Sequence, residues 1–167
     1  MKKKQIITLC ISMSIIAILV LLFINFRLVE MDGPAMNSTI KDGQLMLTKM
    51  NVSEKNLKLY DIIILKPFGE DDMYYCKRIY GLPGDTIQIK KGKIYVNNKK
   101  IDDPYKNIDD NTYAQLGLQA NTKKITLKNN EYFVLGDNRG NSHDSSSPDF
   151  GPIKSSTIKG KVIHVFK

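Results

Sequence analysis

The longest hydrophobic segment of the chain lies at its start. Residues 5–26 carry no charged side chain and consist mainly of Ile, Leu, Val, Met and Phe. A helix rises about 1.5 Å per residue, so a segment of this length can cross the ~30 Å hydrocarbon layer of a bilayer. The pattern predicts one transmembrane helix over residues 5–26, preceded by a short basic terminus at residues 1–4.

Cleaved secretory signal peptides have the same order of charge and hydrophobicity, since lysines at residues 2–4 precede the apolar segment. However, the segment is longer than the roughly 7–15 residues of a signal-peptide core, and residues 25–28 (NFRL) offer no small-residue cleavage site. An uncleaved anchor is the better interpretation. Lysines before an anchor tend to stay in the cytoplasm, so we expect residues 27–167 outside the cell membrane.

Beyond residue 26, hydrophobic residues occur in short runs separated by Gly, Asp and Asn. Several runs are rich in Ile, Val and Tyr, which favour strands. The pairs Lys91-Gly92 and Asn97-Asn98, and the Pro-Gly pair within residues 82–85, have the composition of turns. We therefore expect a mostly β domain. The predicted strands are residues 44–49, 61–65, 73–80, 86–89, 93–96, 131–135 and 160–166.

Residues 101–130 are more polar and less regular than the segments on either side. Long segments of this kind in a compact domain are usually functional loops or insertions. We expect an inserted subdomain or a set of loops here, within one domain formed by residues 27–167.

The chain has 25 lysine and arginine residues against 17 aspartate and glutamate residues, which gives a formal net charge of +8. Beyond the N-terminus its lysines are scattered among Asp and Asn, and no nucleic-acid-binding motif is present. A basic surface beside anionic lipid explains this charge better than nucleic acid does.

The sequence predicts neither a disulfide nor a metal or cofactor site. Cys10 lies inside the apolar segment and Cys76 far outside it, so the two should not meet. His143 and His164 lack clustered Cys, Asp and Glu partners, so a metal site is not expected.

Three segments carry most of the chemical signal: residues 33–40 (GPAMNSTI), 75–85 (YCKRIYGLPGD) and 136–145 (GDNRGNSHDS). Their order and spacing resemble those of type I signal peptidases of peptidase family S26, in a Gram-positive-like form. The resemblance extends over nearly the whole chain. It implies an antiparallel β fold with one N-terminal transmembrane helix, and an extracytoplasmic catalytic domain at residues 27–167.

The expected chemistry needs a buried lysine. A serine hydroxyl attacks poorly until a base takes its proton, and lysine can be that base only where burial lowers its pKa. Strand alternation puts Lys77 on one face with Tyr75 and Ile79. Taken alone, Lys77 would most simply be a solvated strand residue. The resemblance instead makes Lys77 the general base of a Ser-Lys dyad and gives Ser142 the role of orienting its amine.

The resemblance places the nucleophilic serine at residue 35, where this chain has Ala35. A methyl group cannot form an acyl-enzyme, so we expect an inactive chain. Ser38 stands where the family usually has proline, but it lies three residues further on and would direct its oxygen elsewhere. Two explanations of Ala35 stay open: a deliberate inactivating change that lets substrate stay bound, or a natural noncatalytic family member.

By the same resemblance, Asp137, Arg139 and Asp144 hold the Ser142 loop through charge-assisted hydrogen bonds. The family commonly has arginine two residues after the last aspartate, whereas this chain has Ser146. A salt bridge at that position is therefore not expected.

The resemblance also implies that substrate binds as an extended strand added to the sheet. The residues expected to contact it are Asp32, Gly33, Pro34, Met36, Ile40, Tyr75 and Cys76. Among these, Met36, Ile40, Tyr75 and Cys76 are the expected walls of shallow pockets for small side chains at positions −1 and −3 of the preprotein. Without the resemblance, each of the four could equally be a core residue. The backbone N–H of residue 35 would help hold the oxyanion. Because Gly33 has no side chain, any second donor must come from backbone or water.

The expected function is that of a membrane-bound serine endopeptidase that removes signal peptides from exported preproteins, disabled here by Ala35. Its expected partners are signal peptides and the lipid bilayer, and no nucleic acid. The alternative is a noncatalytic chaperone for exported proteins or pilin subunits. A self-cleaving Ser-Lys repressor fits poorly, because those proteins have a DNA-binding domain where this chain has an apolar segment.

Overall fold

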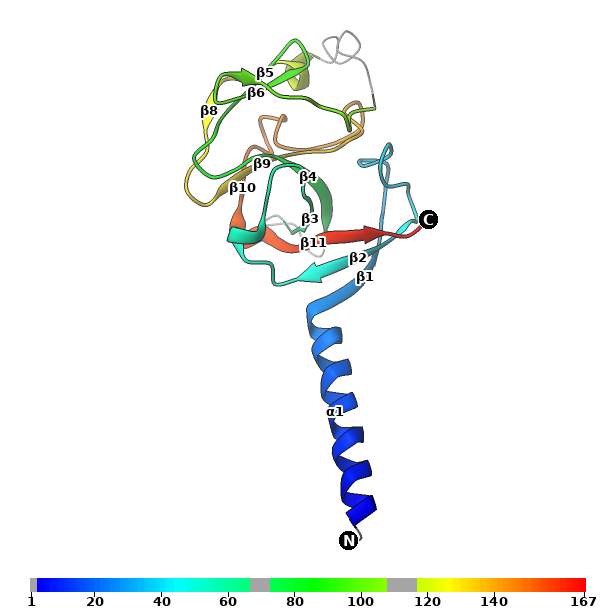
Figure 1. Ribbon diagram of the computed structural model, residues 1–167. Coiled ribbons are helices and arrows are strands. Elements are labelled where there is room, and N and C mark those ends of the chain that lie inside the picture. The colour runs from blue at the N-terminus through cyan, green and yellow to red at the C-terminus, as the bar shows by residue number, and fades with distance from the viewer. Residues whose placement is uncertain (1–2, 67–72, 108–116) are drawn as a thin grey trace.

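The computed structural model describes residues 3–66, 73–107 and 117–167 (Figure 1). Its helix and strands are α1 (Lys3–Asn25), β1 (Phe26–Glu30), β2 (Leu45–Met50), β3 (Ile62–Leu65), β4 (Tyr75–Gly81), β5 (Thr86–Lys90), β6 (Lys93–Val96), β7 (Lys99–Lys100), β8 (Ile125–Thr126), β9 (Glu131–Leu135), β10 (Ile153–Lys154) and β11 (Ile158–Val165). Three short 3₁₀ turns, η1 (Glu54–Asn56), η2 (Gly117–Ala120) and η3 (Ser155–Thr157), complete the described elements. The prediction of a mostly β fold with one N-terminal apolar helix is confirmed.

Helix α1 stands apart from the β domain and has no buried residue. By length and composition it can cross a membrane. No linker separates α1 from β1, because α1 ends at Asn25 and β1 begins at Phe26. Arg27 folds back onto the last turn of α1, where it donates to the carbonyl oxygen of Phe23 and lies 4.2 Å from the centre of the Phe23 ring.

The larger sheet has the strand order β1-β2-β11-β3-β4-β9-β10, and its neighbouring strands are antiparallel. The predicted strands correspond to β2, β3, β4, β5, β6, β9 and β11. Strands β1, β7, β8 and β10 were not predicted. β1 follows the apolar helix without a break in the pattern, and the other three have only two residues each, too few for alternation to be visible.

Strand β4 changes partners along its length. It pairs with β3 from Tyr75 to Arg78 and with β9 from Arg78 to Gly81. On the β9 side, the first residues of β4 therefore have no partner strand among the described residues. β1 is likewise an edge strand, because it pairs only with β2.

The smaller sheet has the order β7-β6-β5-β8 and lies at the end of the molecule opposite α1 (Figure 1). Its hairpins turn at Lys91-Gly92 and Asn97-Asn98, as predicted, and all four residues have positive φ. The predicted insertion at residues 101–130 contributes η2 and β8, and β8 pairs with β5. Residues 108–116 of that segment lie outside the described residues.

Candidate active site

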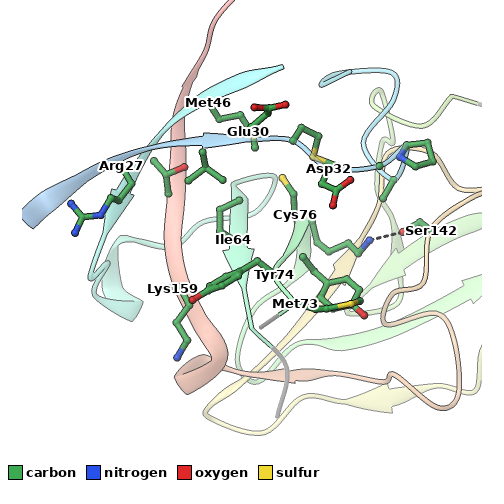
Figure 2. A pocket seen from close by; sticks show the side chains of 18 of the residues that line it. Arg27, Glu30, Asp32, Met46, Ile64, Met73, Tyr74, Cys76, Ser142 and Lys159 are labelled. Atoms are coloured by element: carbon green, nitrogen blue, oxygen red, sulfur yellow. Dashed lines mark hydrogen bonds between the residues drawn. The ribbon is translucent and has the colours of Figure 1, made fainter. Parts of the chain in front are cut away.

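Strand β4 carries Lys77 into the interior, where only 2% of the residue is exposed. Its Nζ atom donates a hydrogen bond to Oγ of Ser142 at 3.0 Å (Figure 2). Burial lowers the pKa of Lys77, and the nearby Asp144 carboxylate and Cys76 partly oppose this shift. The neutral form of the Lys77 amine is therefore populated at lower pH than the neutral form of a solvated lysine.

Gly136, directly after β9, allows two segments of the site to meet. A Cβ atom at this position would lie 2.2 Å from Oγ of Ser142 and 2.6 Å from the carbonyl oxygen of Ala35. Glycine is therefore required for the close approach. Asn138 holds the same two segments together, because its backbone N–H donates to the Ala35 carbonyl and its side-chain amide to the Pro34 carbonyl, both at 3.0 Å.

The buried carboxylate of Asp144 orders the Ser142 loop. It accepts hydrogen bonds from the Gly136 N–H at 2.9 Å and from the Ser146 hydroxyl at 2.7 Å. The Ser146 N–H also donates to Asp144, at 3.1 Å. Ser146 stands where an arginine was expected from the resemblance. The Asp144 carboxylate is instead satisfied by neutral donors, the Ser146 hydroxyl and the N–H groups of Gly136 and Ser146.

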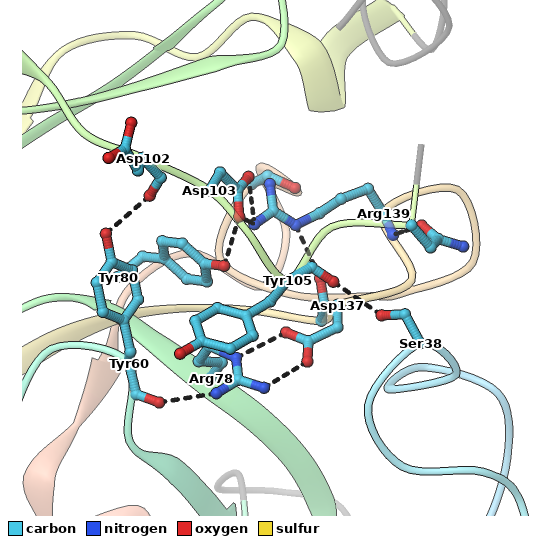
Figure 3. A network of polar contacts seen from close by, with 12 residues as sticks. Ser38, Tyr60, Arg78, Tyr80, Asp102, Asp103, Tyr105, Asp137 and Arg139 are labelled. Carbon is cyan, nitrogen blue, oxygen red and sulfur yellow. Dashed lines mark hydrogen bonds and ion pairs between the residues drawn. The ribbon is translucent and has the colours of Figure 1, made fainter. Parts of the chain in front are cut away.

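A second buried carboxylate, Asp137, forms a bidentate ion pair with Arg78 (Figure 3). The Arg78 Nε and Nη2 atoms donate to the two carboxylate oxygens at 2.9 and 2.6 Å. Arg78 also donates to the Tyr60 carbonyl at 2.9 Å and stacks 3.6 Å from the centre of the Tyr105 ring. The Thr39 hydroxyl also donates to Asp137 at 2.5 Å. This hydrogen bond connects the loop that contains Ala35 to the loop that contains Ser142.

Arg139 joins the loop to Asp103, which lies beyond β7 (Figure 3). Its Nε donates to the Gly136 carbonyl at 2.8 Å, and its Nη2 lies 2.8 Å from a carboxylate oxygen of Asp103. Tyr80 donates to Asp103 at 2.6 Å, and burial raises the pKa of its hydroxyl. The phenol thus stays protonated and keeps this hydrogen bond.

A cleft of about 760 Å³ runs beside these groups (Figure 2). Strand β1, the following residues up to Ala35, the start of β4 and the Ser142 loop supply its walls. Of the residues predicted for the site, those that line this cleft are Asp32, Gly33, Pro34, Ala35, Tyr75, Cys76, Lys77 and Ser142. Burial raises the pKa of the Cys76 thiol to about 12, so this wall residue stays a neutral thiol.

Met36 and Ile40 are located differently from the expectation. Both are fully buried, and they pack in the core with Met46 and Cys76 instead of lining the cleft. Their burial matches the alternative that they are core residues. The Ser38 hydroxyl donates to the Tyr105 carbonyl at 2.8 Å (Figure 3), whereas Lys77 donates to Ser142.

The buried ion pairs of Arg78 with Asp137 and of Arg139 with Asp103 were not predicted from the sequence. The signal was present at Arg78, because alternation puts this arginine on a strand face with Cys76 and Tyr80, where a buried cation needs a carboxylate partner. In the described parts of the chain, no group of three His, Cys, Asp or Glu residues could hold a metal ion.

Comparison with known proteins matches the chain to the family described as "Signal peptidase, peptidase S26" over residues 3–167. Signal peptidase I S of Bacillus subtilis (strain 168) is 36% identical over 150 residues, which cover 86% of this chain and 80% of that protein. Signal peptidase I T of the same strain is 35% identical over 159 residues, covering 91% and 81%. A crystal structure of a signal peptidase I from Enterococcus faecalis V583 has 27% identity and a TM-score of 0.49, covering 67% of this chain and 100% of that chain.

Proposed function

This chain belongs to the peptidase S26 family of signal peptidases, and on that premise we propose that its cleft binds the signal peptides of exported preproteins. Family membership supports signal-peptide removal as the activity of this architecture. The observation that carries the proposal for this chain is the hydrogen bond between buried Lys77 and Ser142 at the wall of the cleft.

In the proposed chemistry, neutral Lys77 is the general base and Ser142 orients its amine. A serine at position 35 would lose its hydroxyl proton to Lys77 and attack the scissile carbonyl carbon. The proton would then pass to the leaving amine, and water would hydrolyse the acyl-enzyme with Lys77 again as base. The backbone N–H of residue 35 would donate to the oxyanion.

Because residue 35 is alanine, the chain lacks only the attacking hydroxyl oxygen of this proposed mechanism. Its side chain is half-buried at the cleft wall, and its carbonyl is held by Asn138. A hydroxyl added to the alanine methyl group adds a single heavy atom to a residue that lines the cleft. The chain as it stands is therefore proposed to bind substrate without cutting it.

Substrate is proposed to add as an extended strand between β1 and the first residues of β4. Both have an edge without a partner strand among the described residues. Asp32 to Pro34 and the pair Tyr75 and Cys76 would contact its backbone, and Cys76, which is apolar and neutral, would border a small side chain.

We propose that α1 spans the cell membrane with residues 1–4 in the cytoplasm, and that residues 27–167 form the catalytic domain outside. The lysines before α1 support this orientation. Because β1 follows α1 directly, the cleft begins close to the membrane, where signal peptides emerge.

The test is preprotein cleavage in detergent by Ala35→Ser, compared with the unchanged chain and with Ala35→Ser/Lys77→Ala. Cleavage is expected from Ala35→Ser alone. Ala35→Ser/Lys55→Ala is the matched control, since Lys55 is exposed and remote from the cleft, and it should retain activity.

A second function, a noncatalytic chaperone for exported proteins or pilin subunits, is favoured by Ala35 within an otherwise complete cleft. The same experiment separates the two functions. If folded Ala35→Ser binds preprotein but cleaves none, the peptidase proposal fails and the chaperone stands.

A further inference from the structure

The cleft is longer than contacts with positions −1 to −3 of a substrate require. Beyond Asp32 to Pro34, its walls continue along β1 as far as Arg27. A strand rises about 3.3 Å per residue, so residues 27–30 leave room for about four further residues of an extended substrate. The apolar walls of this upstream part of the cleft are Leu28, Val29, Met46, Met50, Ile64 and Tyr74.

Methionine is concentrated in the cleft. The chain has seven methionines, and four of them line it: Met31, Met46, Met50 and Met73. Unbranched thioether side chains adapt to apolar groups of different shapes, and they are common on surfaces that bind many sequences. The cleft therefore suits an apolar partner whose sequence varies.

Two side chains of the upstream part expose apolar surface to solvent. Tyr74 is 59% exposed, and Figure 2 shows its side chain on the Lys159 side of the cleft, away from Ser142. On the β1 wall, Leu28 is 63% exposed. An apolar partner that covers such groups removes them from water, so exposed apolar side chains around one groove are typical of a binding surface.

On the basis of the proposed function, we propose that the upstream part of the cleft is a subsite for apolar side chains at positions −5 and −7 of the signal peptide. Along an extended strand, every second side chain faces the same side. Positions −5 and −7 therefore point into the cleft with positions −1 and −3, whereas positions −4 and −6 point away. The occupant is peptide and not lipid, because these walls belong to the same cleft as Ala35 and Lys77.

The position of β1 sets the direction in which the substrate lies. Strand β1 follows α1 directly, so the upstream part is the end of the cleft nearest the proposed membrane span. The part of a signal peptide that precedes position −3 also comes from the membrane. Residues upstream of position −3 thus reach the Leu28 end of the cleft before position −1 reaches residue 35.

The test is binding of two synthetic peptides, spanning positions −7 to +2, to the full chain in neutral detergent, measured by calorimetry. Both have Ala at −1 and −3. One has Leu at −5 and −7 with Ser at −4 and −6, and the other has these four residues exchanged. Because the composition is the same, partition into detergent should be closely similar. The peptide with Leu at −5 and −7 should bind about tenfold more tightly, as expected for burial of its leucines.

Met50→Ser/Tyr74→Ser should reduce this ratio to about threefold or less, because it removes apolar surface from the subsite. Leu45→Ser/Ile163→Ser is the matched control. It removes two exposed apolar side chains that do not line the cleft, and it should leave the ratio unchanged. Thermal unfolding of each variant checks that the fold is intact.

Equal affinity of the two peptides would overturn the subsite and leave the proposed function standing. Equal loss of the preference in the two double variants would also overturn it, since the effect would then belong to apolar surface in general. If neither peptide binds and Ala35→Ser cleaves no preprotein, the proposed function fails and the subsite fails with it.

Discussion

The Nζ atom of Lys77 lies 3.0 Å from Oγ of Ser142, and both residues are buried. If this contact orients the base, Ser142→Ala in the Ala35→Ser background should lower kcat by about 100-fold, near the lower end of what a positioned proton-transfer group contributes. KM should change little, because substrate contacts are retained. Ser142→Thr keeps a hydroxyl and should recover part of the rate. Equal kcat for Ser142→Ala and the parent would remove Ser142 from the mechanism.

Cleavage by Ala35→Ser should rise with pH. Burial lowers the pKa of Lys77, so its neutral form becomes populated below the ordinary lysine pKa of 10.5. The pH profile of kcat/KM, which reports the free enzyme, should therefore have a rising limb whose midpoint lies below 10.5. A midpoint at or above this value would mean that the lysine is not desolvated in solution.

Lys77→Met should stabilise the fold at neutral pH. Because the folded-state pKa of Lys77 is lowered, the unfolded chain binds more protons between that pKa and 10.5, and the free energy of unfolding rises with pH across this window. The advantage of Lys77→Met should therefore shrink as pH rises towards 10.5. Urea unfolding of both proteins between about pH 6 and about pH 10 measures this difference. Exposed Lys55→Met is the control and should show no such trend.

Gly136→Ala should destabilise the fold by about 1–3 kcal/mol, the usual cost of overpacking a filled site. The added carbon would meet Ser142 and the Ala35 carbonyl at 2.2 and 2.6 Å. Gly140→Ala is a close control in the same loop, because a Cβ atom there has no neighbour within 4 Å, and it should change stability by less than about 0.5 kcal/mol. Similar losses from both variants would contradict the close approach.

Asp137→Asn should cost about 3–5 kcal/mol, because it leaves Arg78 buried without its charge partner. Asp61→Asn tests the partly exposed pair of Asp61 with Lys161 at 2.7 Å. Loss of that pair should cost at most about 1 kcal/mol. Thermal unfolding of both variants compares the two pairs, and a small loss at Asp137 would show that Arg78 finds another partner.

Deletion of residues 1–25 should release the β domain from the membrane fraction and leave its unfolding midpoint nearly unchanged. Helix α1 has no buried residue, so its removal takes little from the core. Detergent phase partitioning and thermal unfolding of residues 26–167 provide the two measurements. A large fall in the midpoint would show that α1 supports β1.

The family resemblance was sufficient to predict the pairing of Lys77 with Ser142, because both lie in segments with a distinctive motif. It was insufficient for the partner of Arg78, since alternation indicates a face of a strand but not what packs on that face. Met36 and Ile40 illustrate a related limit. A hydrophobic side chain is expected to be buried whether it forms the wall of a cleft or packs in the core behind that wall. Hydrophobicity alone therefore does not distinguish the two positions.

A further feature depends on a contact between distant segments and so left no local pattern. The edge strand β1 follows an apolar helix, and only its pairing with β2 reveals it.

The direct junction of α1 with β1 has a mechanical consequence. With Arg27 folded back on Phe23 and no linker after Asn25, a change in the tilt of α1 acts directly on β1, one wall of the cleft. Transmembrane helices adjust their tilt to the thickness of the surrounding hydrocarbon layer. If α1 spans a bilayer as proposed, lipid chain length would change its tilt and, through β1, the width of the cleft.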